Sequence, residues 1–361
     1  MKRILLPLAL ALLTFGSASV ASASWLQPRT QQRAFPMADA ERELVVGKSW
    51  LMFKLDFSYS FSNSHFIGDN LFNLGFTEGQ HFERERNEGA WHYRRWDIGA
   101  RYGFSKNSEI FFSVPVVWGE VWNNRMVAAD GTTRKPISAV GLGDVHAGIR
   151  FQWLRWVSDE GPFSNALATD IDIRFPTGNE SPGSYIGGPN NVATIITGTG
   201  GWGFDLSVRF KQQLAILAIE VGLGWEINAV AVVEYLIEDE YNQFNQHLDP
   251  GDRAHLDVGF TFQFFDHLAF KVMFDMDYRT PTKWGSTSSA FPPCKDCEEL
   301  PGSEGFWMDL EGRFIIDVDV HFGLDFYARV PMAGRRNFLW PLEEISPSRA
   351  FTGGADLQVR F

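Results

Sequence analysis

The alternation of apolar and polar residues in the last ten positions is the feature that most constrains the fold. From Thr352 to Phe361 the chain reads TGGADLQVRF, in which every second residue from Ala355 onward is apolar. Asp, Gln and Arg stand between these apolar residues. A period of two is that of a β-strand with one apolar and one polar face. The C-terminus is therefore predicted to be an amphipathic strand.

The same alternation recurs along the chain from residue 50 onward. In the first such segment the odd positions from Leu51 to Phe61 are apolar or aromatic, and Lys54 and Asp56 lie on the opposite face. Ile110–Trp122 does not divide clearly into two faces. The predicted strands are Leu51–Phe61, Arg95–Phe104, Ile110–Trp122, Asp144–Trp156, Leu167–Phe175, Phe204–Lys211, Ala215–Glu226, Leu256–Phe264, Phe270–Tyr278, Phe306–Ile316, Val318–Val330 and Thr352–Phe361.

Composition decides how such a chain could sit in a membrane. Hydrophobic residues make up 45% of the sequence and the mean hydropathy is −0.15, and beyond the N-terminus no apolar run approaches the ~20 residues of a membrane helix. A barrel is the remaining way to span a bilayer, because every backbone polar group must be paired there. The aromatic content of 15%, with 32 Phe and 13 Trp, suits a lipid-facing wall.

The connections between the predicted strands alternate in length. Turns such as Lys106–Ser108 are short, whereas the intervening loops are long and rich in Gly, Pro, Asn or Ser. An even number of strands, with both termini at the short-turn end, is what an outer-membrane barrel requires. We therefore predict an all-β fold, a transmembrane antiparallel barrel of twelve strands over residues 49–361. The predicted outer loops are Ser62–Ala90, Asn123–Ala139, Pro176–Gly201, Asn228–Arg253, Thr280–Gly305 and Pro331–Pro347.

The N-terminus has the pattern of a signal peptide. Lys2 and Arg3 precede an apolar run, and Ala21–Ala23 supplies the small residues of a cleavage site. We expect residues 1–23 to be removed on export and residues 24–48 to form a periplasmic lead-in. The terminal strand ending on Phe361 resembles the signal by which bacterial assembly machinery recognises outer-membrane barrels. The expected location is the Gram-negative outer membrane, with outer-membrane lipid, lipopolysaccharide and the barrel assembly machinery as partners.

Charged residues on the polar strand faces are the candidates for lining the lumen. The formal net charge of −12 argues against nucleic acid as a partner. Two interpretations stay open: a mutually neutralising ladder that partly fills the bore, and a water-lined pore that orients a polar solute. The candidates are Arg95, Asp97, Arg101, Arg150, Asp170, Asp172, Arg174, Asp205, Arg209, Asp257, Asp309, Glu311, Arg313, Asp325 and Arg329.

Smaller signals point to neither a metal nor a cofactor. Pairs such as Asp170 and Asp172 arise from strand alternation itself, and His146 and His321, which we place in the lumen, have no ligand spacing. Cys294 and Cys297 lie in an outer loop, where a local disulfide is expected over zinc because the neighbourhood offers too few ligands.

Two short motifs carry a resemblance to a known family. Val140–Asp144 reads VGLGD before a strand, and Asp172–Gly178 reads DIRFPTG at the end of the next. Together they resemble the outer-membrane barrel family of the MetA pathway of phenol degradation, whose members are described as transporters. The resemblance implies a channel for small, aromatic or hydrophobic molecules and supplies no binding residue.

Two other functions compete with transport. One is a structural or adhesive barrel without transport. The other is a lipid hydrolase, since some outer-membrane barrels carry a Ser–His pair on the outer wall near the rim. The outward stripes show no such pairing, and His65 and His81 fall in a long loop. We therefore predict that the protein is not an enzyme.

Overall fold

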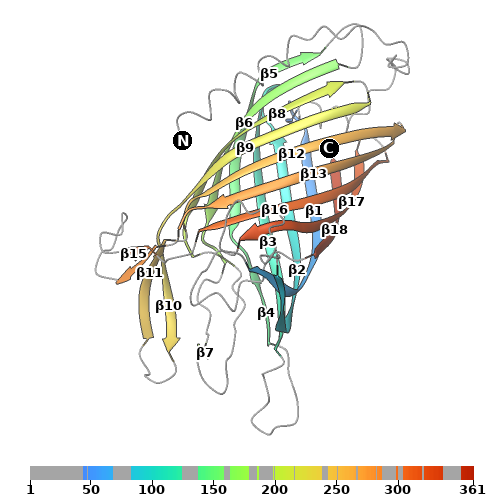
Figure 1. The fold of residues 1–361 in the computed structure, drawn as a ribbon. Helices are drawn as coiled ribbons and strands as arrows, with labels where there is room; N and C mark the ends of the chain where they lie inside the picture. The colour runs from blue at the N-terminus through green and yellow to red at the C-terminus, as the bar shows by residue number, and fades with distance from the viewer. Residues whose placement is uncertain are drawn as a thin grey trace, which may run out of the picture.

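The fold is seen in a computed structural model (Figure 1). It describes residues 44–46, 48–67, 83–123, 137–157, 163–178, 185–186, 198, 200–214, 216–237, 243–249, 251–265, 267–281, 283–286, 298–299, 304–318, 321–335 and 351–361. The expected signal peptide and the pair Cys294 and Cys297 lie outside these residues.

Twelve antiparallel strands form a closed barrel, which confirms the predicted fold class. The first and last strands close it, with Met52 opposite Arg360 at one end of the seam and Phe61 opposite Phe351 at the other. The wall consists of β1 (Leu51–Ile67), β2 (Glu83–Gly103), β3 (Ser108–Asn123), β5 (Val145–Val157), β6 (Phe163–Phe175), β8 (Gly203–Leu214), β9 (Leu217–Asn228), β12 (Arg253–Phe265), β13 (Leu268–Arg279), β16 (Gly305–Asp317), β17 (Phe322–Arg335) and β18 (Phe351–Arg360).

A break at Gly143 and Asp144 divides one wall strand into two pieces. β4 (Ile137–Leu142) pairs with the long-loop half of β3, and β5 pairs with its other half. The Gly143 amide donates to the Pro115 carbonyl at 2.8 Å, so pairing with β3 continues across the break. β4 and β5 therefore act as one crossing of the wall.

The predicted long loops were wrong where they contain strands. β1 continues to Ile67, β2 begins at Glu83, and β17 continues to Arg335. A second sheet forms at the long-loop end from three other predicted loops, Pro176–Gly201, Asn228–Arg253 and Thr280–Gly305 (Figure 1). Its five strands are β7 (Tyr185–Ile186), β10 (Ala231–Ile237), β11 (Gln243–Asp249), β14 (Lys283–Ser286) and β15 (Glu298–Glu299). The reason for the error is that strands beyond the bilayer do not separate lipid from lumen, so their sequences need not alternate.

The short-turn end requires a second correction. β17 begins at Phe322, not at Val318, because the Val318 amide donates to the Phe322 carbonyl at 3.0 Å and closes a turn. His321, which we placed in the lumen, lies in this turn and stacks on Trp50 with ring centroids 6.1 Å apart.

The two faces of the wall follow the alternation. Large apolar side chains such as Ile98, Phe112 and Phe314 are exposed on the outside, as a lipid-facing surface requires. In β3, where the pattern is ambiguous in sequence, Glu109 and Val117 face inward and are buried. The ambiguity arose because apolar residues such as Val117 occupy the inner face of this strand.

Residues 44–46 lie inside the short-turn end of the barrel. Leu44 packs against Ala166 and Ala168, whose small inward-facing side chains leave room for it. These residues belong to the segment expected to be a periplasmic lead-in, and residues 24–43 lie outside the described part.

Across the described ranges, no helix is long and apolar enough to cross a membrane.

Candidate functional site: the charged lumen

Rows of aspartates run around the inner wall. Asp56 on β1 stands opposite Asp97 on β2 and Asp356 on β18, and Asp356 in turn stands opposite Asp325 on β17. A second row joins Asp257, Asp275 and Asp309 on β12, β13 and β16. Like charges directly opposite one another destabilise a sheet. Cations from neighbouring positions must therefore compensate them.

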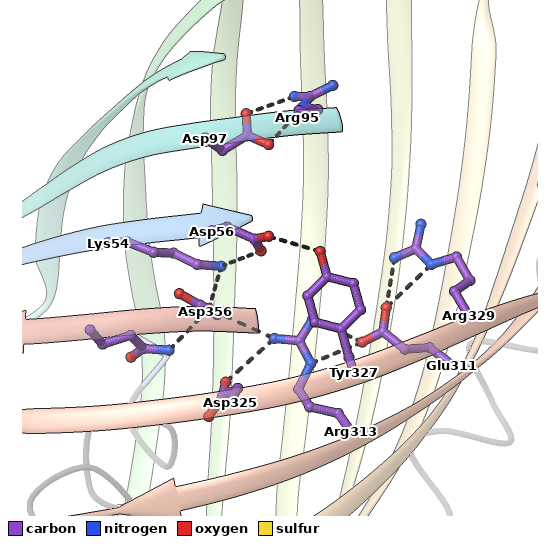
Figure 2. A network of polar contacts seen from close by, with 11 residues as sticks. Lys54, Asp56, Arg95, Asp97, Glu311, Arg313, Asp325, Tyr327, Arg329 and Asp356 are labelled. Atoms are coloured by element: carbon purple, nitrogen blue, oxygen red, sulfur yellow. Dashed lines mark hydrogen bonds and ion pairs between the residues drawn. The ribbon is translucent and has the colours of Figure 1, made fainter. Parts of the chain in front are cut away.

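Basic side chains reach into the first row from both sides (Figure 2). Lys54 Nζ lies 2.8 Å from Asp356, and Arg313 lies 3.5 Å from Asp325 and 3.9 Å from Asp356. Arg95 binds Asp97 through two nitrogen atoms, at 2.6 and 2.8 Å. Three cations thus offset most of the charge of the four aspartates, and Lys54 and Arg95 remain partly accessible to solvent.

Tyr327 ties three strands of this row together. Its hydroxyl donates to Asp56 at 2.8 Å, and its ring lies under the Arg313 guanidinium, 4.8 Å from centroid to Cζ. To reach β1 from β17 the ring crosses Gly354 on β18, where an added Cβ would collide with it. Glycine on the inner face therefore provides space that a neighbour's side chain fills.

Glu311 connects the first row to the second. Its side chain is fully buried and lies 2.8 Å from both Arg313 and Arg329. Arg329 also lies 3.4 Å from Asp275. Breaking a buried ion pair by removing one partner costs about 3–5 kcal/mol, so Glu311 is expected to be hard to replace.

On the opposite wall the ion pairs continue across β13, β9, β8, β6 and β5. Lys271 binds Glu220 at 2.8 Å, and Arg209 binds Asp170 at 2.9 Å. Arg150 binds the same Asp170 at 2.6 Å. Positive and negative side chains therefore alternate along the wall from β13 to β5.

Glu109 and two arginines hold residues 44–46 in the bore. Glu109 is fully buried, lies 2.7 Å from Arg101, and accepts the Val46 amide at 2.7 Å. Arg101 and Arg150 both donate to the Leu44 carbonyl, at 3.1 and 2.8 Å. Leu44 has a positive φ of 46°, a conformation that costs about 1–3 kcal/mol for a non-glycine residue. These charged hydrogen bonds offset that cost.

Further ion pairs of the inner wall lie at the long-loop end. Arg174 binds Glu226 and lies 3.7 Å from Asp144. Arg253 binds Asp277 at 2.6 Å. His146 Nδ1 lies 2.7 Å from Asp172 Oδ2. Asp205 lies 3.5 Å from His255.

The two motifs that carry the family resemblance fold against each other. The Thr177 hydroxyl donates to the Gly143 carbonyl at 2.8 Å and accepts from the Val145 amide at 3.0 Å. The Gly178 amide donates to Asp144 at 3.1 Å. The PTG segment thus fastens the end of β6 to the break between β4 and β5, which is a structural role.

All fifteen candidate residues lie on the inner face, and most are brought into the networks above. Asp257 sits against Gly222, without a cation among the contacts described here. The candidate set omitted buried acids that organise the networks, above all Glu109 and Asp356. Asp356 could have been found from the alternation of the last strand, whereas Glu109 required the inner face of β3 to be known. Within the described part of the chain, no group of three or more His, Cys, Asp or Glu side chains is placed to hold a metal.

Comparisons with known proteins support the architecture. No protein-family model matches the chain, and no curated protein matches it. The outer membrane channel COG4313 from Pseudomonas putida F1 aligns with a TM-score of 0.59 and 9% identity, over 87% of this chain and 96% of that one. The β domain of the Bordetella autotransporter BrkA (TM-score 0.39, 8% identity, 87% of this chain and 100% of that one) and the monoaromatic hydrocarbon channel TodX (0.39, 8%, 88% and 90%) align too weakly to support an argument. The chain thus has the fold of an outer-membrane β-barrel.

Proposed function

We propose that this protein is a channel of the Gram-negative outer membrane that passes small solutes. The observation that carries the proposal is the inner wall, where ion-paired side chains of both signs line the bore from Arg101 at the short-turn end to Arg174 at the long-loop end. A charged lining whose side chains are partly accessible to solvent favours polar or ionised groups in transit. The likeness in fold to an outer membrane channel agrees with this reading.

The solutes we propose are small aromatic or hydrophobic molecules, including aromatic acids. Support for this finer statement comes from the resemblance of VGLGD and DIRFPTG to the phenol-degradation barrel family. Passage also requires residues 44–46 to move or leave a path beside them, because they occupy the short-turn end of the bore.

Conductance in planar bilayers tests the channel directly. Replacing Arg150, Arg209 and Arg313 with Gln leaves Asp170, Glu311 and Asp325 with fewer cations, so the pore should become more cation-selective. The control is Arg94→Gln, which removes a positive charge from the outer wall and should leave selectivity unchanged.

Uptake in cells tests the solute class. Loss of the protein should slow entry of aromatic acids and hydrocarbons. Absence of conductance together with unchanged uptake would favour a structural or adhesive barrel. Lipid hydrolysis by the purified protein would favour an enzyme, although the outward-facing His92 contacts Tyr59 and Phe61 and not a serine in the contacts described here.

A further inference from the structure

A polar cluster lies on the outer wall, where lipid-facing residues are otherwise mostly apolar. His92 and Arg94 on β2 face outward, whereas the adjacent Arg95 faces inward. Glu120 on β3 stands directly opposite His92. Arg94 lies 3.1 Å from Glu120. The His92 Nδ1 and the Tyr59 hydroxyl on β1 are 2.6 Å apart.

An aromatic platform supports this cluster. The Arg94 guanidinium lies over the Trp118 ring at 4.7 Å, a cation–π contact, and Trp118 itself is 44% exposed. The next row toward the short-turn end is apolar, with Phe57 packed on Trp96 at 4.5 Å. The boundary between charged and apolar rows therefore falls between Arg94 and Trp96.

The cluster lies near the outer edge of the apolar band. The step from Leu51, at the start of β1, to Tyr59 corresponds to roughly 20 Å of height at about 3.3 Å per residue and a strand tilt of about 40°. The apolar band of such barrels is about 25 Å tall, and long loops face outward from the cell. If the band begins at Leu51, Arg94, which stands opposite Tyr59, lies about 5 Å below its outer edge, and its long side chain can extend to the headgroup level of the outer leaflet.

Arg94, the cation of this cluster, indicates an anionic occupant that competes with Glu120. An arginine facing lipid is costly near the midplane but finds anionic headgroups at the interface. The outer leaflet of a Gram-negative outer membrane presents lipopolysaccharide, whose lipid A carries phosphates above several acyl chains. Beside Tyr59 the row continues to Gly353 and Ala328, which project little from the wall and leave a headgroup unobstructed.

We propose that Arg94, on the platform of Tyr59 and Trp118, binds a lipid A phosphate of lipopolysaccharide. Arg94 supplies the charge-assisted hydrogen bond to phosphate, and the exposed Trp118 ring and the partly exposed Tyr59 ring pack against the sugar and the first methylenes of the acyl chains. Glu120 orients Arg94 and competes with the phosphate for it, because both are anions. The site is separate from the lumen and does not depend on what the channel carries.

The test measures binding of lipid A to the purified full-length protein in detergent with EDTA, by native mass spectrometry. Arg94→Gln should weaken lipid A binding about tenfold or more, the loss of one hydrogen bond to a charged group. Glu120→Gln should strengthen binding by removing the competing carboxylate. The matched control is Arg95→Gln, which removes the same charge from the adjacent residue on the inner wall and should leave binding unchanged (Figure 2).

Three results would overturn the proposal. One is equal binding by the wild-type protein and Arg94→Gln, both checked for folding by the mobility of the unboiled protein on gels. Another is an equal loss in Arg94→Gln and Arg95→Gln, which would reflect overall charge. The third is equal affinity for dephosphorylated lipid A or phosphatidylglycerol, since the site would then not recognise a lipid A phosphate.

Discussion

Replacing Glu109 with Ala should release residues 44–46 from the lumen. Glu109 accepts the Val46 amide at 2.7 Å and orients Arg101, which donates to the Leu44 carbonyl. A hydrogen bond to a charged group contributes about 1.5–3 kcal/mol. Losing the bond to Val46 should therefore raise the equilibrium constant for undocking about ten- to hundredfold, since 1.4 kcal/mol is a factor of ten. The strained backbone of Leu44, with its positive φ, also favours undocking, because the strain is relieved when the segment leaves its site.

Labelling of a cysteine placed in the segment measures this equilibrium. Val45 is only 1% exposed, so Val45→Cys should react slowly with a membrane-impermeant maleimide while the segment is docked. The two native cysteines, Cys294 and Cys297, are first replaced by Ser. In this background Glu109→Ala should increase the labelling rate by the factor given above, and channel conductance should rise with it.

The control for this experiment lies on the same strand. Glu120→Ala removes a carboxylate from the outer face of β3 and should leave labelling at position 45 unchanged. Folding of each variant is checked by the shift in gel mobility between boiled and unboiled protein. An unchanged labelling rate in folded Glu109→Ala would refute the view that Glu109 holds the segment in place.

Two further predictions concern the wall and its closure. Leu357→Arg on the outer face of β18 should block insertion or cost about 2–4 kcal/mol near the midplane, whereas Gln358→Arg should be tolerated because Asp356 is 3.4 Å from the Gln358 side chain. Equal stability of the two variants in a urea unfolding assay would contradict this assignment of the two faces, and a larger loss in Gln358→Arg would mean that they are reversed. Deleting Phe361 should lower the amount of folded barrel in the outer membrane without affecting export, because Phe361 exchanges two backbone hydrogen bonds with Leu51, at 2.9 and 3.1 Å, and packs on Phe53. Phe104→Ala, which removes another exposed aromatic residue from the short-turn end, is the control, and normal assembly of the truncated chain would argue against a special role for the terminal residue.

The sequence by itself determined the wall. Each crossing separates lipid from lumen, and residues such as Leu357 and Gln358 must therefore alternate in polarity with the period of a strand. Strand number, closure and the inward direction of the candidate charges all follow from that one pattern. The prediction from alternation failed in the strands of the second sheet, which do not separate lipid from lumen. It also failed where the inner face of a wall strand is itself apolar, as at Val117 on β3.

Only the tertiary structure decided which charges meet. Asp56, Asp97, Asp325 and Asp356 share a row because of the register between four strands, and register depends on the backbone pairing around the whole closed sheet. The position of Leu44 in the bore likewise depends on Glu109 of β3 and on Ala166 and Ala168 of β6, two strands that are far from Leu44 in the chain and carry no common motif. Such contacts are set by the pairing of the strands, because it brings side chains from neighbouring strands within hydrogen-bonding reach of one another and of residues 44–46.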